Sequence, residues 1–180
     1  MTELASLLKK LIAREGGFAD HPADRGGATN WGITSAVARQ NGYVGEMRDL
    51  SRAEAERIYR SVYWEKPGYS ALEALAPSLA AELFDAGVNT GPQTATRFLQ
   101  RALNALNRNG HDYADLAVDG ECGSVTREAL SRFLAKRGAP GVAVLVKAVQ
   151  ALRGAHYITL AENRSANEAF VYGWLNNRIG

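Results

Sequence analysis

The chain of 180 residues has a single cysteine, Cys122, so no disulfide can form within it. No apolar run approaches the ~20 residues that a membrane-spanning helix needs, and we therefore expect no membrane insertion. The N-terminal residues lack the basic and then apolar regions of a secretory signal, so we expect synthesis in the cytoplasm without a signal peptide. The sequence also shows no internal repeat, which excludes solenoid architectures.

Charge of one sign is scarce as well. The net charge is only +2 and no cluster of five Lys or Arg residues occurs, so we expect no nucleic acid as a partner. The mild basic excess suits an anionic polymer such as a cell wall. Cys122 and the three histidines, His21, His111 and His156, are scattered, which supports neither a zinc site nor a Cys–His nucleophile. We expect no metal and no cofactor.

Periodicity predicts the fold class. Almost every periodic segment repeats its apolar residues every 3.6 positions, so we expect a mainly α protein. The glycine-rich residues 16–34 predict loops with a short β-hairpin. Gly87 is expected to stop one helix, and residues 88–92 to form a tight turn before the next. Helices are expected over residues 3–15, 35–41, 52–66, 71–87 with an interruption near Pro77, 92–106, 124–137 and 142–162, and around 170–175. Thr34 or Ser35 is expected to cap the second helix, a Ser51–Glu54 capping box to precede the third, and Pro92 to open the helix over 92–106.

The end of the first helix carries the strongest candidate for chemistry. Glu15 falls on the apolar stripe of this helix and is followed by Gly16 and Gly17, which predict a helix stop. Partial burial and the negative end of the helix dipole both disfavour the charged carboxylate, so its pKa should rise, as a general acid requires. The alternative is a frayed terminal glutamate turned to solvent. The stripe consists of Leu4, Leu7, Leu8, Leu11 and Ile12.

The loop that follows offers a second carboxylate. Asp24 comes nine residues after Glu15, and Thr29 five residues later. Hydrolysis of a glycosidic bond commonly uses two carboxyl groups, and the spacing leaves both an inverting and a retaining arrangement open. Thr29 could hold a water, and Trp31 offers a flat face to a sugar ring. The alternatives are a turn aspartate and a core tryptophan, and Asp20 is a second candidate carboxylate.

One long motif resembles a known family. It reads Glu15-Gly16-Gly17-Phe18, then Pro22-x-Asp24-x-Gly26-Gly27-x-Thr29-x-x-Gly32-Ile33-Thr34. This motif resembles the opening signature of glycoside hydrolase family 108, which comprises lysozyme-like N-acetylmuramidases of phage endolysins, gene-transfer-agent lysis cassettes and some toxin-secretion systems. The family commonly has tyrosine at Phe18, and the step from Asp24 to Thr29 is one residue shorter than in phage-type lysozymes.

The resemblance extends over nearly the whole chain. Residues 55–64 and 83–92 resemble the family's aromatic helix and the segment that lines its cleft. Residues 118–126 and 173–179 resemble the predicted peptidoglycan-binding domain that usually follows. The resemblance therefore implies a lysozyme-like hydrolase domain over residues 1–95 and a helical peptidoglycan-binding domain over residues 96–180.

The same resemblance implies an activity and roles for residues. It implies hydrolysis of the β-1,4 bond between N-acetylmuramic acid and N-acetylglucosamine, with Glu15 as the acid. Asp24 would stabilise the developing cation or, with Thr29, orient water. Trp31, Tyr59 and Asn89 would bind the substrate. Aromatic residues at helical spacing such as Tyr59 more often belong to the core, and Asn89 could equally terminate a helix.

Two other functions stay open at this point. A lytic transglycosylase would need Glu15 but not Asp24. A wall-binding or secretion-accessory protein would need neither. The expected partner is peptidoglycan, with a holin or a secretion machinery for export, and we expect a monomer.

Overall fold

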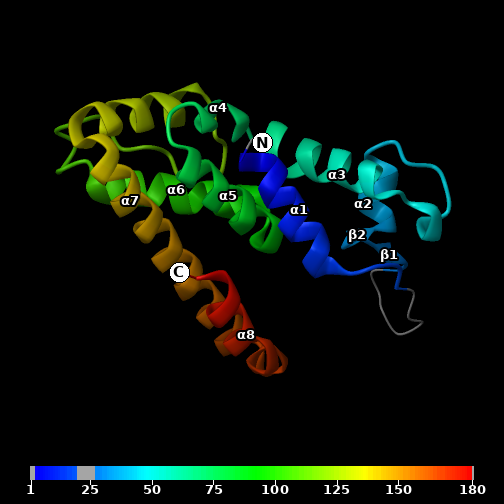
Figure 1. The fold of residues 1–180 in the computed structure, drawn as a ribbon. Helices are drawn as coiled ribbons and strands as arrows, with labels where there is room; N and C mark the ends of the chain where they lie inside the picture. Colours follow the sequence, from blue (N-terminus) through cyan, green and yellow to red (C-terminus); the bar gives the residue numbers. More distant parts are fainter. Residues whose placement is uncertain (1–2, 20–26, 180) are drawn as a thin grey trace. The chain divides into compact units, whose positions relative to one another are not determined.

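The computed structural model describes residues 3–19 and 27–179; of residues 3, 14 and 15 it describes the backbone alone. The chain divides into two compact units, Met1–Lys66 and Pro67–Gly180. Figure 1 shows that both are built mainly of helices, with one small hairpin. The predicted fold class is therefore confirmed, and the division of the chain between residues 95 and 96 stays a prediction.

The first unit begins with the predicted helix. Leu8 and Ile12 of α1 are buried, as are Leu4 and Leu11, and α1 packs against α3. Gly16 follows with φ +74°, the left-handed conformation that ends helices at this position. The elements of this unit are α1 (Glu3–Glu15), β1 (Thr29–Asn30), β2 (Ile33–Thr34), α2 (Ser35–Gln40), the 3₁₀ helix η1 (Met47–Asp49), α3 (Arg52–Arg60) and the π-helix η2 (Ser61–Glu65).

The predicted hairpin forms at residues 29–34. Its strands are antiparallel, with Asn30 opposite Ile33. The two-residue loop has positive φ at both positions, 53° at Trp31 and 75° at Gly32, as a type I′ turn requires. Thr34 then caps α2, because its Oγ1 accepts a hydrogen bond from the Val37 amide at 3.3 Å.

The third helix starts at its predicted cap. Ser51 Oγ accepts a hydrogen bond from the Glu54 amide at 3.2 Å, but the Glu54 carboxylate pairs with Arg57 at 2.6 Å. Half of the predicted capping box is therefore present. Beyond Arg60 the chain forms a π-helix, in which a backbone amide bonds the carbonyl five residues earlier. Lys66 N donates to Ser61 O in this way, at 3.0 Å. Such π segments are rare, and many of those known lie at functional sites.

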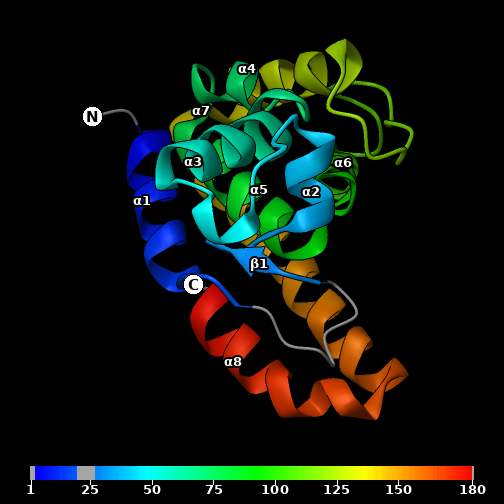
Figure 2. The ribbon, with the colours of Figure 1, turned by 90° about the vertical axis from the view of Figure 1, so that its right-hand side faces the viewer.

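The second unit is helical in all its described elements. Helices α5 and α6 pack on each other and both pack on α7. Figure 2 shows α8 folding back from the end of α7. The elements are α4 (Ser70–Glu73), α5 (Pro77–Thr90), α6 (Pro92–Leu106), α7 (Ser124–Asn163), the 3₁₀ helix η3 (Ser165–Asn167) and α8 (Glu168–Arg178).

The corner between α5 and α6 corrects the predicted turn. Helix α5 continues through Gly87 to Thr90, and Gly91 alone, with φ +86°, separates it from α6. Gly87 lies inside the helix, where an added Cβ would make only an ordinary van der Waals contact, 3.5 Å from Pro92 Cα. The buried Tyr69 hydroxyl donates to Pro92 O at 2.8 Å and lies 2.9 Å from Thr96 Oγ1, and burial raises the pKa of Tyr69. Pro92 decides where the helix ends, because the residue before a proline is disfavoured in the helical conformation.

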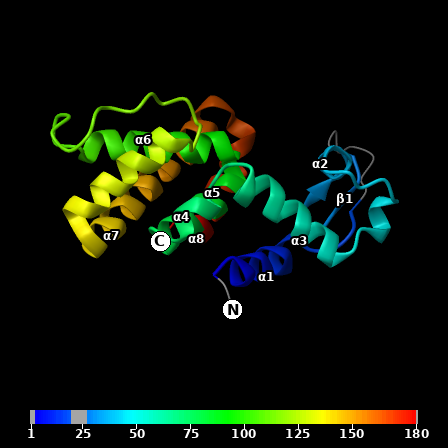
Figure 3. The same cartoon turned by 90° about the horizontal axis from the view of Figure 1, so that it is seen from above.

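Residues 107–123 are irregular, as predicted, and run back along α6 (Figure 3). The amide of Asn104 bonds both backbone groups of Leu116, at 2.9 and 2.8 Å. Gln100 accepts from the Gly120 amide at 2.9 Å and donates to Asp119 Oδ1 at 2.7 Å. These side chains of α6 replace the backbone ladder that the loop lacks.

The long helix α7 is broken where the sequence predicts a break. Gly138 has φ +61° and ψ −161°, so residues 124–137 and the residues after Pro140 form two helical stretches. The left-handed φ at Gly138 is open to glycine at little cost. The label α7 therefore covers both of the helices that the sequence predicts over residues 124–137 and 142–162.

A buried arginine joins α7 to α5. Arg153 has a relative exposure of 1 %. Its Nη1 lies 2.9 Å from Glu82 Oε1 and its Nη2 lies 2.6 Å from Asp85 Oδ2. Its Nε donates to the Tyr157 hydroxyl at 2.8 Å. The guanidinium thus has acceptors on three sides, which a charge removed from water requires.

The same helix carries a half-buried histidine that predicts a pH effect on stability. Partial burial lowers the pKa of His156 from 6.5. Its ring lies edge-on to that of Phe98, with the two ring centroids 5.6 Å apart. The folded state therefore binds a proton less readily than the unfolded state, so unfolding free energy should fall as pH drops from about 7.5 through 6.5 towards about 5.5.

His156→Gln provides the comparison, measured by urea denaturation over that pH range. The wild type should lose more stability than the variant on acidification. A wild-type curve parallel to that of the variant would contradict the assignment, because the other titrating groups are common to both proteins.

In the part of the chain that the structure describes, no helix combines the length and the apolar character needed to cross a membrane.

Candidate functional site

Glu15 is the last residue of α1, where the sequence predicts it. Its backbone ends the helix directly before the left-handed Gly16. The side chain of Glu15 and the whole of Asp24 and Asp20 lie outside the described residues. The roles of Glu15 and Asp24 therefore stay predictions, and the site is described from its surroundings.

The segment after Glu15 is held against the hairpin. Ala19 N donates to Thr29 O at 2.9 Å and Thr29 N donates to Ala19 O at 2.8 Å, so Ala19 extends the hairpin by one bridge. The four residues from Glu15 to Ala19 span at most about 14 Å. Thr29 thus lies within this reach of the end of α1, and its catalytic role stays a prediction. Its Oγ1 stands 3.4 Å from Ala19 O, a weak contact that leaves the hydroxyl able to bind a water.

Trp31 occupies the hairpin turn in a conformation unusual for a large side chain. Its φ of +53° lies in the left-handed region, which costs roughly 1–2 kcal/mol outside glycine. The indole Nε1 donates to Leu50 O at 2.8 Å, and Trp31 O accepts from the Tyr59 hydroxyl at 3.1 Å. These two bonds hold the half-buried ring in place. Binding of a sugar ring by Trp31 stays a prediction.

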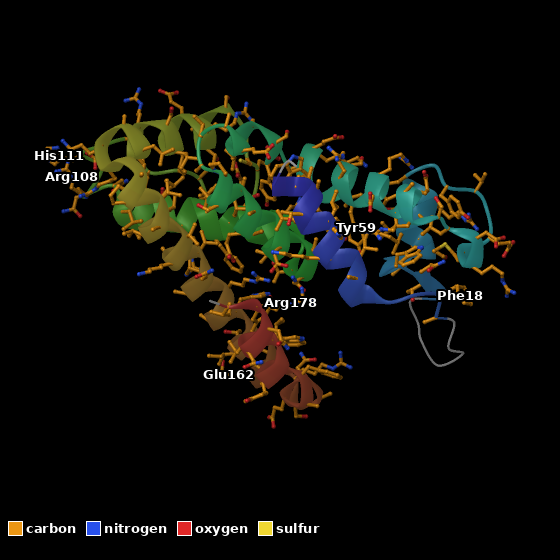
Figure 4. The ribbon with its side chains drawn as sticks, in the orientation of Figure 1. Phe18, Tyr59, Arg108, His111, Glu162 and Arg178 are labelled. Atoms are coloured by element: carbon orange, nitrogen blue, oxygen red, sulfur yellow. The ribbon has the colours of Figure 1, made fainter. Side chains whose placement is uncertain are left out.

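Tyr59 lies beneath this turn rather than on the surface. Its exposure is 2 %, and its ring centroid is 5.7 Å from that of Tyr63 in the π segment. Figure 4 marks Tyr59 on α3 and Phe18 on the segment after α1. The hydrogen bond to Trp31 suits Tyr59 to supporting the hairpin. A direct contact between Tyr59 and substrate stays a prediction.

Asn89 belongs to the second unit. It is exposed in the last turn of α5, not in a turn between helices, and its Nδ2 donates to Asp85 O at 2.5 Å. That bond is the one expected of an asparagine near a helix end. Its predicted contact with the substrate is a separate question, and the binding role stays a prediction.

Asn30 is a residue of this region that the sequence did not single out. It is 4 % exposed, and its Nδ2 donates to Met47 O at 2.8 Å and to Arg48 O at 3.3 Å. The hairpin is thereby fixed to η1. Arg48 in turn lies over the Phe18 ring, 5.6 Å from its centroid, beside the segment that follows Glu15. Only a weak signal in the sequence pointed to Asn30, namely a polar residue beside Thr29 in the predicted hairpin.

Replacing Asn30 by alanine should destabilise the first unit. The Arg48 carbonyl would lose this donor and the Met47 carbonyl would keep only the Leu50 amide, at 3.2 Å; each lost hydrogen bond costs about 0.5–1.5 kcal/mol. We expect a loss of that size in urea denaturation and weaker activity as the hairpin loosens.

Asn176→Ala is the matched control, because Asn176 is exposed in the second unit; its effect should stay within about 0.5 kcal/mol. Equal stability of the Asn30 and Asn176 variants would show that the buried amide does not hold the hairpin.

Metal-ligating residues do not gather among the described residues. No group of three or more His, Cys, Asp or Glu side chains in residues 3–19 and 27–179 could hold an ion. Cys122 is buried, and burial raises the pKa of its thiol to about 11, so little thiolate forms at neutral pH.

Comparisons with known proteins match two family models and a solved structure to this chain. Residues 8–91 match the model of the family described as glycosyl hydrolase 108, and residues 94–179 match that described as predicted peptidoglycan domain. The solved structure of Brucella abortus SagA is similar with a TM-score of 0.70 and 25 % identity, over 97 % of this chain and 88 % of that one. Among curated proteins no match is found.

Proposed function

Because the chain carries a glycosyl hydrolase 108 domain followed by a predicted peptidoglycan-binding domain, we propose that it is an N-acetylmuramidase. It hydrolyses the β-1,4 bond between N-acetylmuramic acid and N-acetylglucosamine in peptidoglycan. The observation that carries the proposal is the position of Glu15: it ends α1 and leads into a segment that pairs with Thr29.

The proposed chemistry needs a proton and a water. Glu15 protonates the glycosidic oxygen, and the bond to the anomeric carbon breaks with oxocarbenium character. Asp24 stabilises that cation or, with Thr29, orients the attacking water. The Thr29 hydroxyl supports the second role because its described contact, 3.4 Å to Ala19 O, is weak.

The first unit supplies rigidity for this reaction. Asn30, Trp31 and Tyr59 fix the hairpin to η1, to Leu50 and to α3. Catalytic groups held by such bonds keep their geometry as the substrate binds. Trp31 would stack on a sugar ring, and Asn89 would bond the N-acetyl or peptide groups of the substrate.

The test is digestion of purified peptidoglycan by the wild type, with the released muropeptides reduced and identified by mass spectrometry. Muramic acid at the new reducing ends supports the proposal. N-acetylglucosamine ends would mean cleavage of the other bond, and 1,6-anhydro ends would mean a lytic transglycosylase. No release at all would leave a binding protein.

Asp24→Asn separates the hydrolase from the transglycosylase further. A hydrolase that uses two carboxyl groups should lose most of its activity. A transglycosylase should keep full activity and form anhydro ends.

The substrate also implies a route, since peptidoglycan lies outside the cytoplasmic membrane. We propose that the chain acts in the periplasm or wall after release by a holin or a secretion machinery. Cells that make the protein alone should stay intact and should lyse once their membrane is permeabilised. Lysis without permeabilisation would contradict this route.

A further inference from the structure

Helix α8 exposes an unusual amount of aromatic surface. The structure describes all eleven of its residues, and none of them is buried. Phe170 is 58 % exposed and Tyr172 79 % exposed. Isolated apolar residues are common on surfaces, but a contiguous aromatic face marks an interaction site.

One face of α8 combines two rings with an amide. Phe170 and Trp174 are four residues apart, and their rings lie at 20° with centroids 6.2 Å apart. Asn177, three residues further, falls on the same face at about 100° per residue. We call these three residues the α8 aromatic face.

The neighbours of this face hold it in position. Trp174 packs against Tyr157 of α7, with ring centroids 5.6 Å apart. The Asn177 Oδ1 accepts a hydrogen bond from Asn176 at 3.1 Å, which orients its amide. The face is thus anchored on α7 rather than carried by a loose helix.

The α8 aromatic face carries no charge. Phe170, Trp174 and Asn177 are all neutral, and the nearby Arg178 is directed to Asp85, 3.6 Å away on α5. A neutral ligand therefore fits better than an anionic one. In peptidoglycan the neutral faces belong to the sugar rings, whereas the stem peptides carry carboxylates.

We propose that the α8 aromatic face binds the N-acetylhexosamine rings of the glycan strand. The C–H face of a sugar is apolar and stacks on the electron-rich face of an aromatic ring. The Asn177 amide can bond hydroxyl or acetamido groups at the rim of the same sugar. The proposal rests on peptidoglycan as the ligand, but not on which bond the first unit cleaves.

The test is co-sedimentation of the full chain with purified sacculi, in a Glu15→Gln background that keeps the sacculi intact. Phe170→Ala should raise the apparent Kd about tenfold, the usual order of one lost ring contact. Trp174→Ala should do at least as much, with Trp174→Phe intermediate. Circular dichroism confirms that each variant is folded.

Tyr172→Ala is the matched control. Tyr172 lies two residues from Phe170, about 200° around the helix, so Tyr172→Ala removes a ring that is more exposed than Phe170 from the other side of the helix. Its binding should be unchanged. Equal weakening by Phe170→Ala and Tyr172→Ala would overturn the assignment to one face.

Two further measurements identify the occupant. Soluble glycan strands, freed of stem peptides by an amidase, should still bind in isothermal titration calorimetry, and soluble N-acetylglucosamine oligomers should compete. Binding that disappears with the peptides would overturn the proposal. So would a dimer in analytical ultracentrifugation that Phe170→Ala dissociates, because a second copy would then cover the face. Reducing-end release by the wild type is measured separately, so failure of the muramidase proposal is distinguishable.

Discussion

Glu15→Gln should lower the rate of reducing-end release from peptidoglycan by a factor of about 10²–10⁴, the usual contribution of a general acid. Glutamine has the same shape but no proton to give to the leaving oxygen. The reason lies in the position of Glu15 at the end of α1, where the helix dipole disfavours a carboxylate and so favours the protonated acid.

The fold should tolerate this change. Glutamine and glutamate have similar helix propensities, and loss of a negative charge at a helix C-terminus is mildly favourable. Thermal unfolding should therefore be unchanged. Glu46→Gln, an exposed position in the same unit, is the control and should keep full activity. A Glu15→Gln protein that still releases most of the wild-type muropeptides would rule out Glu15 as the acid.

Arg153→Ala should give the largest loss of stability, about 3–5 kcal/mol in urea denaturation. The substitution leaves the carboxylates of Glu82 and Asp85 without the guanidinium that now lies 2.9 and 2.6 Å away. It also removes the donor to Tyr157 and opens space between α5 and α7. The loss should approach the lower end of that range, because Asp85 is partly open to solvent.

Arg132→Ala is the matched control for Arg153, since both residues lie in α7 and both have a carboxylate partner. The Arg132–Glu128 pair is exposed and should contribute at most about 1 kcal/mol. Adding Glu82→Gln to Arg153→Ala should restore part of the stability by removing an unpaired carboxylate. Equal losses for Arg153→Ala and Arg132→Ala would contradict the role of the buried network.

Local sequence patterns predict the local structure well. The bounds of α1, the hairpin, the caps Thr34 and Ser51 and the start of α6 at Pro92 all depend on neighbouring residues, and all are confirmed. The predicted end of α5 was wrong because Gly87 and Gly91, four residues apart, can both end a helix. Pro92 decides between them, because the residue directly before a proline is disfavoured in the helical conformation.

Long-range polar contacts could not be predicted in the same way. Arg153 pairs with Glu82, 71 residues earlier, and Asn30 with Met47, 17 residues later. Neither of these pairings between residues far apart in the sequence follows from a periodic pattern. One signal was present: Arg153 interrupts the stripe of Leu145, Val149 and Tyr157, where a charge needs a partner.

The candidate site likewise has features that the local sequence predicts and features that it does not. The motif from Glu15 to Thr34 pointed to the chemistry, and the helix end and hairpin follow from its glycines. The burial of Tyr59 and the left-handed Trp31 depend on how α3 and η1 meet the hairpin, which only three-dimensional packing determines.

The one-residue corner at Gly91 limits how this protein can be cut or recombined. The hydrolase family match ends at residue 91 and the peptidoglycan domain match begins at residue 94. Yet α5, before that point, packs on α6 and α7, after it. A truncation at the family boundary would expose to water the faces of α5 that now pack on α6 and α7. Exchange of the second module between relatives should therefore succeed only when α5 travels with it.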